Sequence, residues 1–407
     1  MNRNLRPISR LFLPSLAAAL LLMLGACAPN KPATAVKAAF WPPYPDEPRL
    51  QYLVSYSQST DVEPERSALD QLVYGKEPQK VLPVSKPYGV AMYQGKIYVC
   101  DLRGACVTIL DLRNHRMLVM GKTGAETLLS PTAIAISPDG MKYVADIGRG
   151  MIYVYDAQDR LAGRIGHKDL KPAGVAVYQN ELYVCDFQTQ KVEVFDRMSG
   201  QLIRTFGEPG GEPGQFIRPL GIAVDAQGFV YVCDVMKCVI QKFDHEGKLV
   251  ANLSGISANV GGLVRPKHIA VDPNGTIFVV DSAFQNVQLF DQIGRVYTFF
   301  GGTGDFPGAM FLPAGICIHE GDLDLFQKYY HPAFQPERLI LVTNQFGDKK
   351  VSVYAYGHLK PGKTVADIAG SKDIVKLGVG ENKGPLTSQP APGTDDEAAP
   401  TTQPAGQ

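Results

Sequence analysis

The sequence predicts an all-β protein, a β-propeller of six similar blades. Six prolines each open a near-copy of one apolar phrase, such as PYGVAM and PLGIAV. They are spaced 44, 41, 47, 47 and 47 residues apart, at Pro87, Pro131, Pro172, Pro219, Pro266 and Pro313. A repeat of roughly 40–50 residues with three or four short strands is typical of propeller blades.

Each unit contains three recognisable strands. The proline opens the first strand, and the second ends in an acid or amide, as in IYVCD and ILVTN. The third strand follows a short turn, as in VTILD. We therefore place the blades near 86–130, 130–171, 171–218, 218–265, 265–312 and 312–360, within one domain over residues 48–370.

Residues 1–26 are predicted to be a signal peptide. Three arginines precede an apolar run over residues 11–24, which is too short to span a bilayer comfortably. The segment ends in LGAC, which resembles the bacterial lipobox. The resemblance implies that Cys27 carries fatty acids such as palmitate; cleavage of an ordinary export signal is the alternative. Since Ala28 replaces the aspartate that retains lipoproteins in the inner membrane, we expect an outer-membrane lipoprotein of a Gram-negative bacterium, facing the periplasm or the cell exterior.

The segments on either side of the repeats have the composition of linkers. Residues 27–47 are rich in Pro and Ala and are predicted to be a tether, although Phe40 and Trp41 are alternatively placed against the propeller. Residues 371–407 have the composition of a disordered tail. We expect the strand-like stretch 49–55 to close blade six, with residues 365–369 as the rival.

The repeat and its linkers resemble one known family. The linker GEPGGEPGQF over residues 207–216, together with the proline-led units, is similar to NHL-repeat six-bladed propellers. The resemblance covers about three quarters of the chain. It implies an architecture and no single activity, because the family is functionally diverse.

The acids that recur at strand ends are expected to be structural. One polar residue ends the second strand of every blade: Asp101, Asp146, Asp186, Asp234, Asp281 and Asn344. Asp and Asn side chains at such positions accept hydrogen bonds from turn amides. A catalytic site requires a few dissimilar groups that converge, so we assign these residues to turn capping.

Six cysteines remain after Cys27 in a disulfide-permissive compartment. Two blades carry a cysteine both near the end of the second strand and before the third. Directly opposed residues of antiparallel strands are close enough for a disulfide. We therefore predict the pairs Cys100–Cys106 and Cys233–Cys238, with four buried thiols as the alternative. Cys185 and Cys317 are expected to be free.

His268 occupies a position that the other blades fill with Gly or Ala, two residues after the opening proline. First strands line the channel of a propeller, so we expect His268 at the channel mouth as a hydrogen-bonding group. A metal ligand or catalytic residue is the alternative, although His319 alone does not complete a zinc site. We expect no metal and no cofactor.

Blade six has an insertion over residues 321–338. It contains four aromatic residues of the types that anchor interfaces: Phe326, Tyr329, Tyr330 and Phe334. We consider two interpretations, a lid packed on the propeller and a surface for docking a partner.

Charge and motifs limit the function. The formal charge is 0, and removal of residues 1–26 with their three arginines leaves −3, with no basic stripe for nucleic acid. We expect a non-catalytic, membrane-anchored scaffold that binds an envelope protein, peptide or other ligand. The alternatives are a lyase or lactonase-type enzyme around His268 and, with less support, an accessory of an envelope redox assembly.

Overall fold

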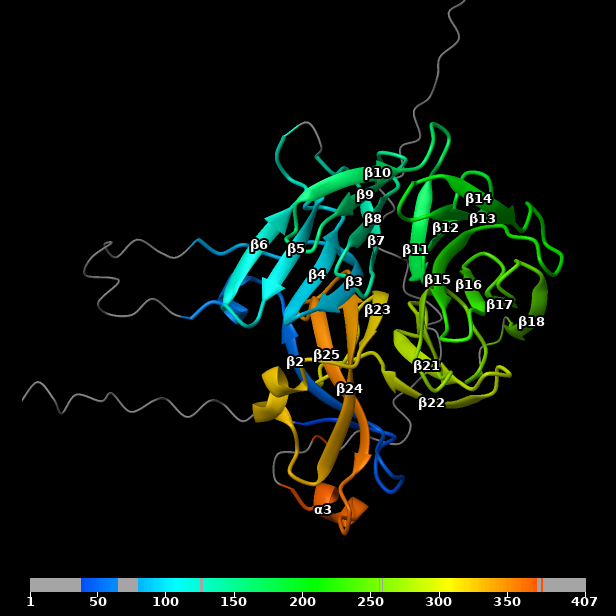
Figure 1. Cartoon of the computed structure of the whole chain (residues 1–407). Coiled ribbons are helices and arrows are strands. Elements are labelled where there is room, and N and C mark those ends of the chain that lie inside the picture. Colours follow the sequence, from blue (N-terminus) through cyan, green and yellow to red (C-terminus); the bar gives the residue numbers. More distant parts are fainter. Residues whose placement is uncertain are drawn as a thin grey trace, which may run out of the picture. The chain divides into compact units, whose positions relative to one another are not determined.

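The computed structural model describes residues 38–64, 80–124, 127–255, 257, 259–371 and 375. The predicted signal peptide, Cys27 and nearly all of the predicted tail lie outside this part of the chain. Within it, six antiparallel sheets surround a common axis, so the predicted all-β, six-bladed propeller is confirmed (Figure 1).

The first five blades are four-stranded meanders. Blade one contains β3 (Pro87–Tyr93), β4 (Lys96–Asp101), β5 (Cys106–Asp111) and β6 (Arg116–Met120), and blade two contains β7 (Pro131–Ile136), β8 (Lys142–Asp146), β9 (Met151–Tyr155) and β10 (Leu161–Ile165). Blade three contains β11 (Pro172–Tyr178), β12 (Glu181–Asp186), β13 (Lys191–Asp196) and β14 (Leu202–Phe206). Blade four contains β15 (Pro219–Val224), β16 (Val230–Asp234), β17 (Val239–Phe243) and β18 (Leu249–Ser254), and blade five contains β19 (Pro266–Val271), β20 (Ile277–Asp281), β21 (Asn286–Phe290) and β22 (Val296–Gly301).

The position of each strand in its blade explains its sequence. Second strands are covered on both faces by neighbouring blades, so they are continuous apolar runs, as in the fully buried β16. Outermost strands have one face in solvent and alternate between exposed and buried residues, as in β10 and β18. The core is therefore divided into apolar clusters between adjacent sheets.

Blade six is closed by the N-terminal segment. Its sheet has the order β1 (Phe40–Trp41), β2 (Leu50–Tyr56), β25 (Val351–Leu359), β24 (Phe334–Asn344) and β23 (Pro313–His319). Closure by residues 49–55 is thus confirmed, whereas the rival stretch forms the helix α3 (Val365–Ala369). In the part of the chain that the structure describes, the other helical turns are η1 (Ser59–Asp61) and η2 (Leu323–Tyr329).

Phe40 and Trp41 dock on the propeller, which is the alternative that the sequence left open. Trp41 is 3% exposed, and its ring lies 5.9 Å from that of Tyr354 and 6.3 Å from that of Phe300. Among the residues that the structure describes, no helix is long and apolar enough to cross a membrane.

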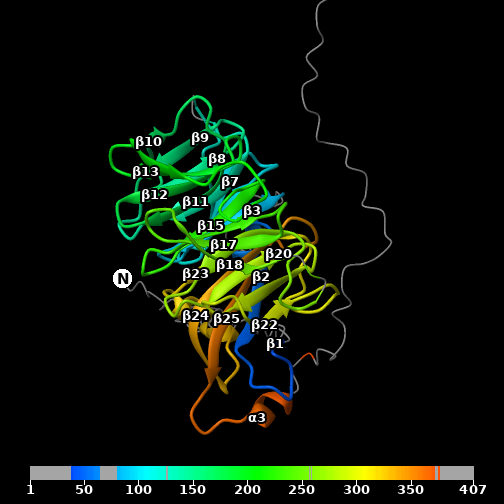
Figure 2. The ribbon, with the colours of Figure 1, turned by 90° about the vertical axis from the view of Figure 1, so that its right-hand side faces the viewer.

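The meander topology gives the ring two different faces. Because successive strands reverse direction, the second-to-third turns and the linkers between blades share one face, which we call the linker face. The other turns lie on the opposite face. Leu50, at the start of β2, pairs with Tyr356 near the end of β25, so β2 begins at the opposite face, and β1 runs antiparallel to it along this end. Two perpendicular views show α3 near the end of the long β24–β25 hairpin (Figures 1 and 2), and Figure 2 shows β1 on the same side of the ring.

Candidate functional site

The acids that end the second strands hold the linkers to the ring. Asp281 is fully buried and accepts hydrogen bonds from the backbone N–H groups of Val264 and Ala283 at 2.7 and 2.9 Å. Asp101, Asp146, Asp186 and Asp234 accept equivalent bonds from their own linkers and turns. In blade six, Asn344 accepts a bond from the N–H of Phe311 at 3.1 Å. These groups are occupied by backbone donors, in agreement with the expected structural role.

His268 lies where neighbouring first strands approach most closely. A Cβ atom added to Gly221 would lie 2.7 Å from the Cα of His268, which explains why this position is small in the other blades. The Nδ1 atom of His268 is buried and has no hydrogen-bond partner among the described residues. Burial lowers the pKa of the imidazole to about 4, so the side chain is neutral at pH 7.

The second histidine considered for this site lies elsewhere. His268 is near the start of β19, and His319 is at the end of β23, where its Nε2 atom lies 2.9 Å from Asp322. Within the described ranges, no group of three or more His, Cys, Asp or Glu residues is placed to hold a metal ion.

The predicted disulfides are not formed. All six cysteines of the propeller are free thiols, and the register explains why. Cys100 is opposite Val107, whereas Cys106 is opposite Asp101, so the two thiols point to opposite faces of the sheet. In blade four, Cys233 is opposite Ile240, and Cys238 lies in the turn with φ 54°. The prediction that the paired cysteines lie directly opposite each other is therefore wrong. In blade one, the pairing register differs by one residue from the register that the disulfide requires.

The aromatic insertion of blade six packs against the core. Phe326 and Phe334 are fully buried, and the Phe334 ring lies 5.7 Å from that of Phe40. The side chain of Gln51 in β2 donates to the carbonyl of Tyr329 at 2.7 Å. The hydroxyl of Tyr330 donates to the carbonyl of Leu323 at 2.9 Å. These contacts favour the lid, because the two phenylalanines are not accessible to a partner.

A cluster of basic side chains gathers where the linkers meet the channel, a place we call the channel mouth. Lys267 follows the opening proline of β19, and its Nζ atom donates to Oε1 of Gln345 at 3.1 Å. The same Nζ lies 5.7 Å from the ring of Tyr88, which follows the opening proline of blade one. Lys350 donates to the carbonyl of Gln345 at 3.1 Å. Strands and turns of three blades thus converge at this point.

The charges at the channel mouth repel one another. Burial, together with the nearby Arg265 and Lys86, lowers the pKa of Lys267 to about 8, and burial is the largest of these causes. Burial and Arg103 also lower the pKa of Lys350, against the opposite effect of Asp101 and Asp348. Within the part of the chain that the structure describes, Lys267 forms no ion pair with a carboxylate.

A pattern in the sequence indicates this basic cluster, although the sequence analysis above did not predict it. Basic residues flank the opening proline in four blades: Lys86, Lys171, Arg218, Arg265 and Lys267. The residues next to an opening proline lie at the linker face, beside the channel. Arg218 stacks over the ring of Phe187 at 4.9 Å, so a further cation is held on this face in blades three and four.

Exposed apolar side chains are concentrated on the same face. Six large hydrophobic residues that are at least 40% exposed lie in its turns and linkers: Val81, Leu129, Ile217, Met236, Val260 and Phe346. The turns and loop of the opposite face expose three, Tyr44, Met198 and Ile293. The others that the structure describes lie on outermost strands. The linker face therefore combines apolar side chains with basic ones, a composition that suits recognition.

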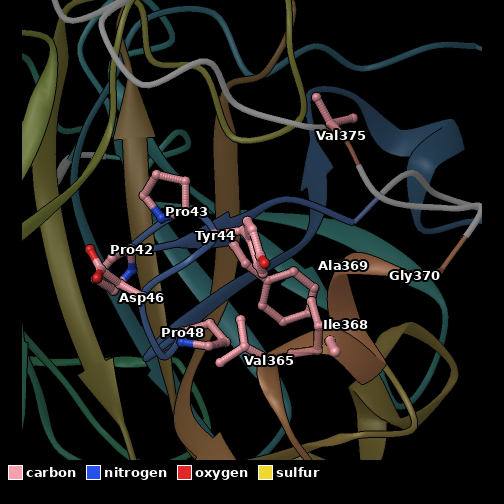
Figure 3. Close-up of a pocket in the computed structure, with 12 residues that line it drawn as sticks. Pro42, Pro43, Tyr44, Asp46, Pro48, Val365, Ile368, Ala369, Gly370 and Val375 are labelled. Atoms are coloured by element: carbon pink, nitrogen blue, oxygen red, sulfur yellow. The ribbon is translucent and has the colours of Figure 1, made fainter.

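An apolar cavity of about 550 Å³ lies beside blade six, away from the channel mouth. Figure 3 shows Tyr44, Pro48, Val365 and Ile368 around this space, which the loop before β2 and the helix α3 enclose. Asp46 is the one carboxylate among its described lining residues. The cavity offers an apolar surface and no pair of groups for acid–base chemistry.

Comparisons with known proteins identify the fold of this chain and no family. No protein-family profile matches the sequence. A protein of unknown function from Bacteroides thetaiotaomicron shares 16% identity and a TM-score of 0.50, over 67% of this chain and 69% of that chain. Virginiamycin B lyase from Staphylococcus aureus shares 12% identity and a TM-score of 0.48, over 67% of this chain and 95% of that chain. At these identities, the likeness shows a common propeller fold alone.

Proposed function

We propose that the protein is a non-catalytic binding scaffold of the cell envelope, tethered through an acylated Cys27, which takes a partner on its linker face. The observation that carries this proposal is the concentration of exposed apolar residues and unpaired basic groups on that face. Met, Phe and Arg are enriched in protein interfaces, and Met236, Phe346 and Arg218 lie there.

The path of the chain supports this orientation. The first described strand, β1, lies beside the end of β2 that is at the opposite face. Ten residues separate Cys27 from Ala38, so the connection could extend over roughly 35–40 Å. A lipid anchor on this segment leaves the linker face open to a partner.

The charge of the face indicates the chemistry of the partner. Lys267 and Lys350 share Gln345 as a hydrogen-bond acceptor and have no carboxylate as an ion-pair partner in the described chain. Complementary charge guides association and excludes partners of the same sign. The proposed partner is therefore a protein or peptide segment that presents acidic groups beside apolar ones.

Site-specific photocrosslinking in cells tests the proposal. A photoreactive residue replaces Phe346 on the linker face or Met198 on the opposite face, which are 50% and 74% exposed. We expect a crosslinked partner from position 346 and none from position 198. Equal crosslinking from both positions, or from position 198 alone, would contradict the proposed face.

Membrane fractionation tests the tether separately. The Cys27→Ala chain should lose fatty-acid labelling and membrane association. Retention of both in this variant would exclude Cys27 as the anchor. Partner crosslinking from position 346 should also weaken when the protein is no longer held at the membrane.

A further inference from the structure

We propose that the channel mouth is a binding site for a doubly charged oxyanion, a phosphate group, held by Lys267, Arg265 and Lys86. The inference rests on the proposed function and specifies the chemical group that the linker face recognises.

The backbone brings together cations that are far apart in the sequence. Lys86 and Arg265 precede the opening prolines of blades one and five, and Lys267 follows the second of these. Blade six lies between them and contributes Ala314, a fully buried small residue, at the corresponding position. The side chain of Lys267 consequently extends to the ring of Tyr88 in blade one, 5.7 Å away.

The neighbouring carboxylates are already occupied. Asp101 accepts backbone N–H groups of Ser85 and Lys86, and Asp281 accepts those of Val264 and Arg265. Both are buried, so they hold the linkers in place and do not form ion pairs with the side chains at the mouth. Among the residues that the structure describes, the acceptor for the Lys267 ammonium is the neutral side chain of Gln345.

This arrangement is unfavourable until an anion is present. An ammonium group that is partly buried beside two further cations loses hydration without gaining an opposite charge. A phosphate monoester carries about −1.5 to −2 charge at pH 7, inorganic phosphate is a mixture of its singly and doubly charged forms, and both accept several hydrogen bonds. Lysine and arginine groups bind such oxyanions by charge-assisted hydrogen bonds, and arginine can do so with two parallel bonds. A single carboxylate would balance fewer of the three charges.

Other groups near Lys267 also favour the binding of an anion. Lys350 shares Gln345 with Lys267, and Arg103 lies close enough to Lys350 to lower its pKa. Burial raises the pKa of Tyr88 to about 12, so its hydroxyl keeps its proton at pH 7. The charged groups that shift the pKa of Lys267 are thus cations, whereas Asp101 and Asp348 raise the pKa of Lys350.

Isothermal titration calorimetry on the full mature chain in non-ionic detergent tests the site. Sodium phosphate is titrated at constant ionic strength, with sodium acetate as the singly charged comparison. We expect saturable binding of phosphate at one site and at least tenfold weaker binding of acetate. Lys267→Gln and Arg265→Gln should each weaken phosphate binding about tenfold or more. Arg265 is exposed, so its variant tests the site even if Lys267→Gln unfolds.

Lys248→Gln is the matched control, because this exposed lysine lies in the turn before β18 on the opposite face and undergoes the same loss of charge. Glycerol 3-phosphate forms a second arm. Binding of both ligands supports recognition of a phosphoryl group on a larger molecule, and binding of inorganic phosphate alone supports a site for the free ion. Absence of phosphate binding, equal binding of acetate, or an equal loss in Lys248→Gln would overturn the inference. None of these outcomes would affect the crosslinking and fractionation results that test the scaffold.

Discussion

Asp281 illustrates at the residue scale how each blade is held to the next. Its buried carboxylate accepts four backbone N–H groups, two from the preceding linker and two from the following turn. A hydrogen bond to a charged acceptor contributes more than a neutral one, and an unpaired buried donor is costly. One such residue in each blade therefore fixes the position where linker and turn meet.

We expect Asp281→Ala to lower the free energy of unfolding by about 2–4 kcal/mol, because four buried N–H groups lose their acceptor. Urea denaturation followed by circular dichroism measures the change. Asp305→Ala is the control: this acid is fully exposed in a linker and should change the stability by less than about 0.5 kcal/mol. Equal effects of the two substitutions would contradict the structural role.

His268 should make stability depend on pH. Its pKa is about 4 in the folded protein, below the ordinary 6.5 of the unfolded chain. Between these values the unfolded chain binds a proton that the folded protein does not. The free energy of unfolding should therefore fall as the pH decreases from about 6.5 to 4. The stabilisation that comes from neutral His268 is fully present above about pH 6.5.

Replacement of His268 by Gln should remove this part of the pH dependence. Thermal unfolding of wild type and variant between pH 4 and 7 measures the difference, in which the titration of shared carboxylates cancels. The exposed His115 provides the control as His115→Asn, since Asn tolerates the left-handed φ of 49° at that position. If the stability of His268→Gln depends on pH as steeply as that of the wild type, the imidazole is not held neutral in the folded protein.

At the scale of elements, the insertion of blade six is a structural cover. Its helical turn η2 presents Phe326 to a cluster that contains Phe40 and Phe334. Gln51 binds the insertion to β2 through the carbonyl of Tyr329 and the N–H of His331. The insertion therefore connects β24 to the strand that closes the ring.

We expect Phe326→Ala to destabilise the protein by about 3–5 kcal/mol, the usual cost of truncating a buried Phe. Replacement of the exposed neighbour, Gln327→Ala, should lower the free energy of unfolding by less than about 0.5 kcal/mol. Urea titrations measure both. Partner crosslinking from position 346 should persist in folded Phe326→Ala protein, and its selective loss would restore the insertion as a docking surface.

For the whole molecule, the decisive contact is the closure of the ring by β2. This strand pairs with β25 from Leu50 to Tyr56, and it buries Leu50, Tyr52 and Leu53. Without it, the long β25 strand would have an unpaired edge, which invites association with other chains.

A chain that begins at residue 38 should fold as a cooperative monomer, because β1 and β2 are intact. A chain that begins at residue 57 lacks both strands and should aggregate or unfold, since the lost burial is comparable to the stability of a domain, about 5–15 kcal/mol. Size-exclusion chromatography and thermal unfolding distinguish these results. A stable monomer from residue 57 would show that closure does not depend on β2.

Much of the architecture could be predicted because its causes are local. The proline-led phrases, the apolar second strands and the acids at their ends recur in each unit, so the number of sheets and the order of strands follow from the repeat. The closing strand was also predictable, since blade six lacked an outer strand and residues 49–55 had the pattern of one.

The sequence by itself determined that six equivalent sheets form a ring, because each blade has the same local pattern of strands and turns. The tertiary structure decided how residues from different elements meet. The strand register places Cys100 and Cys106 one residue away from direct opposition, so they lie on opposite faces of the sheet. Packing against the core buries Phe326 and Phe334. Lys86 and Lys267 are 181 positions apart and repel each other at the channel mouth only because the ring returns to its start. These contacts between distant residues form only when the ring of sheets is closed, and a local sequence pattern does not show which residues closure brings together.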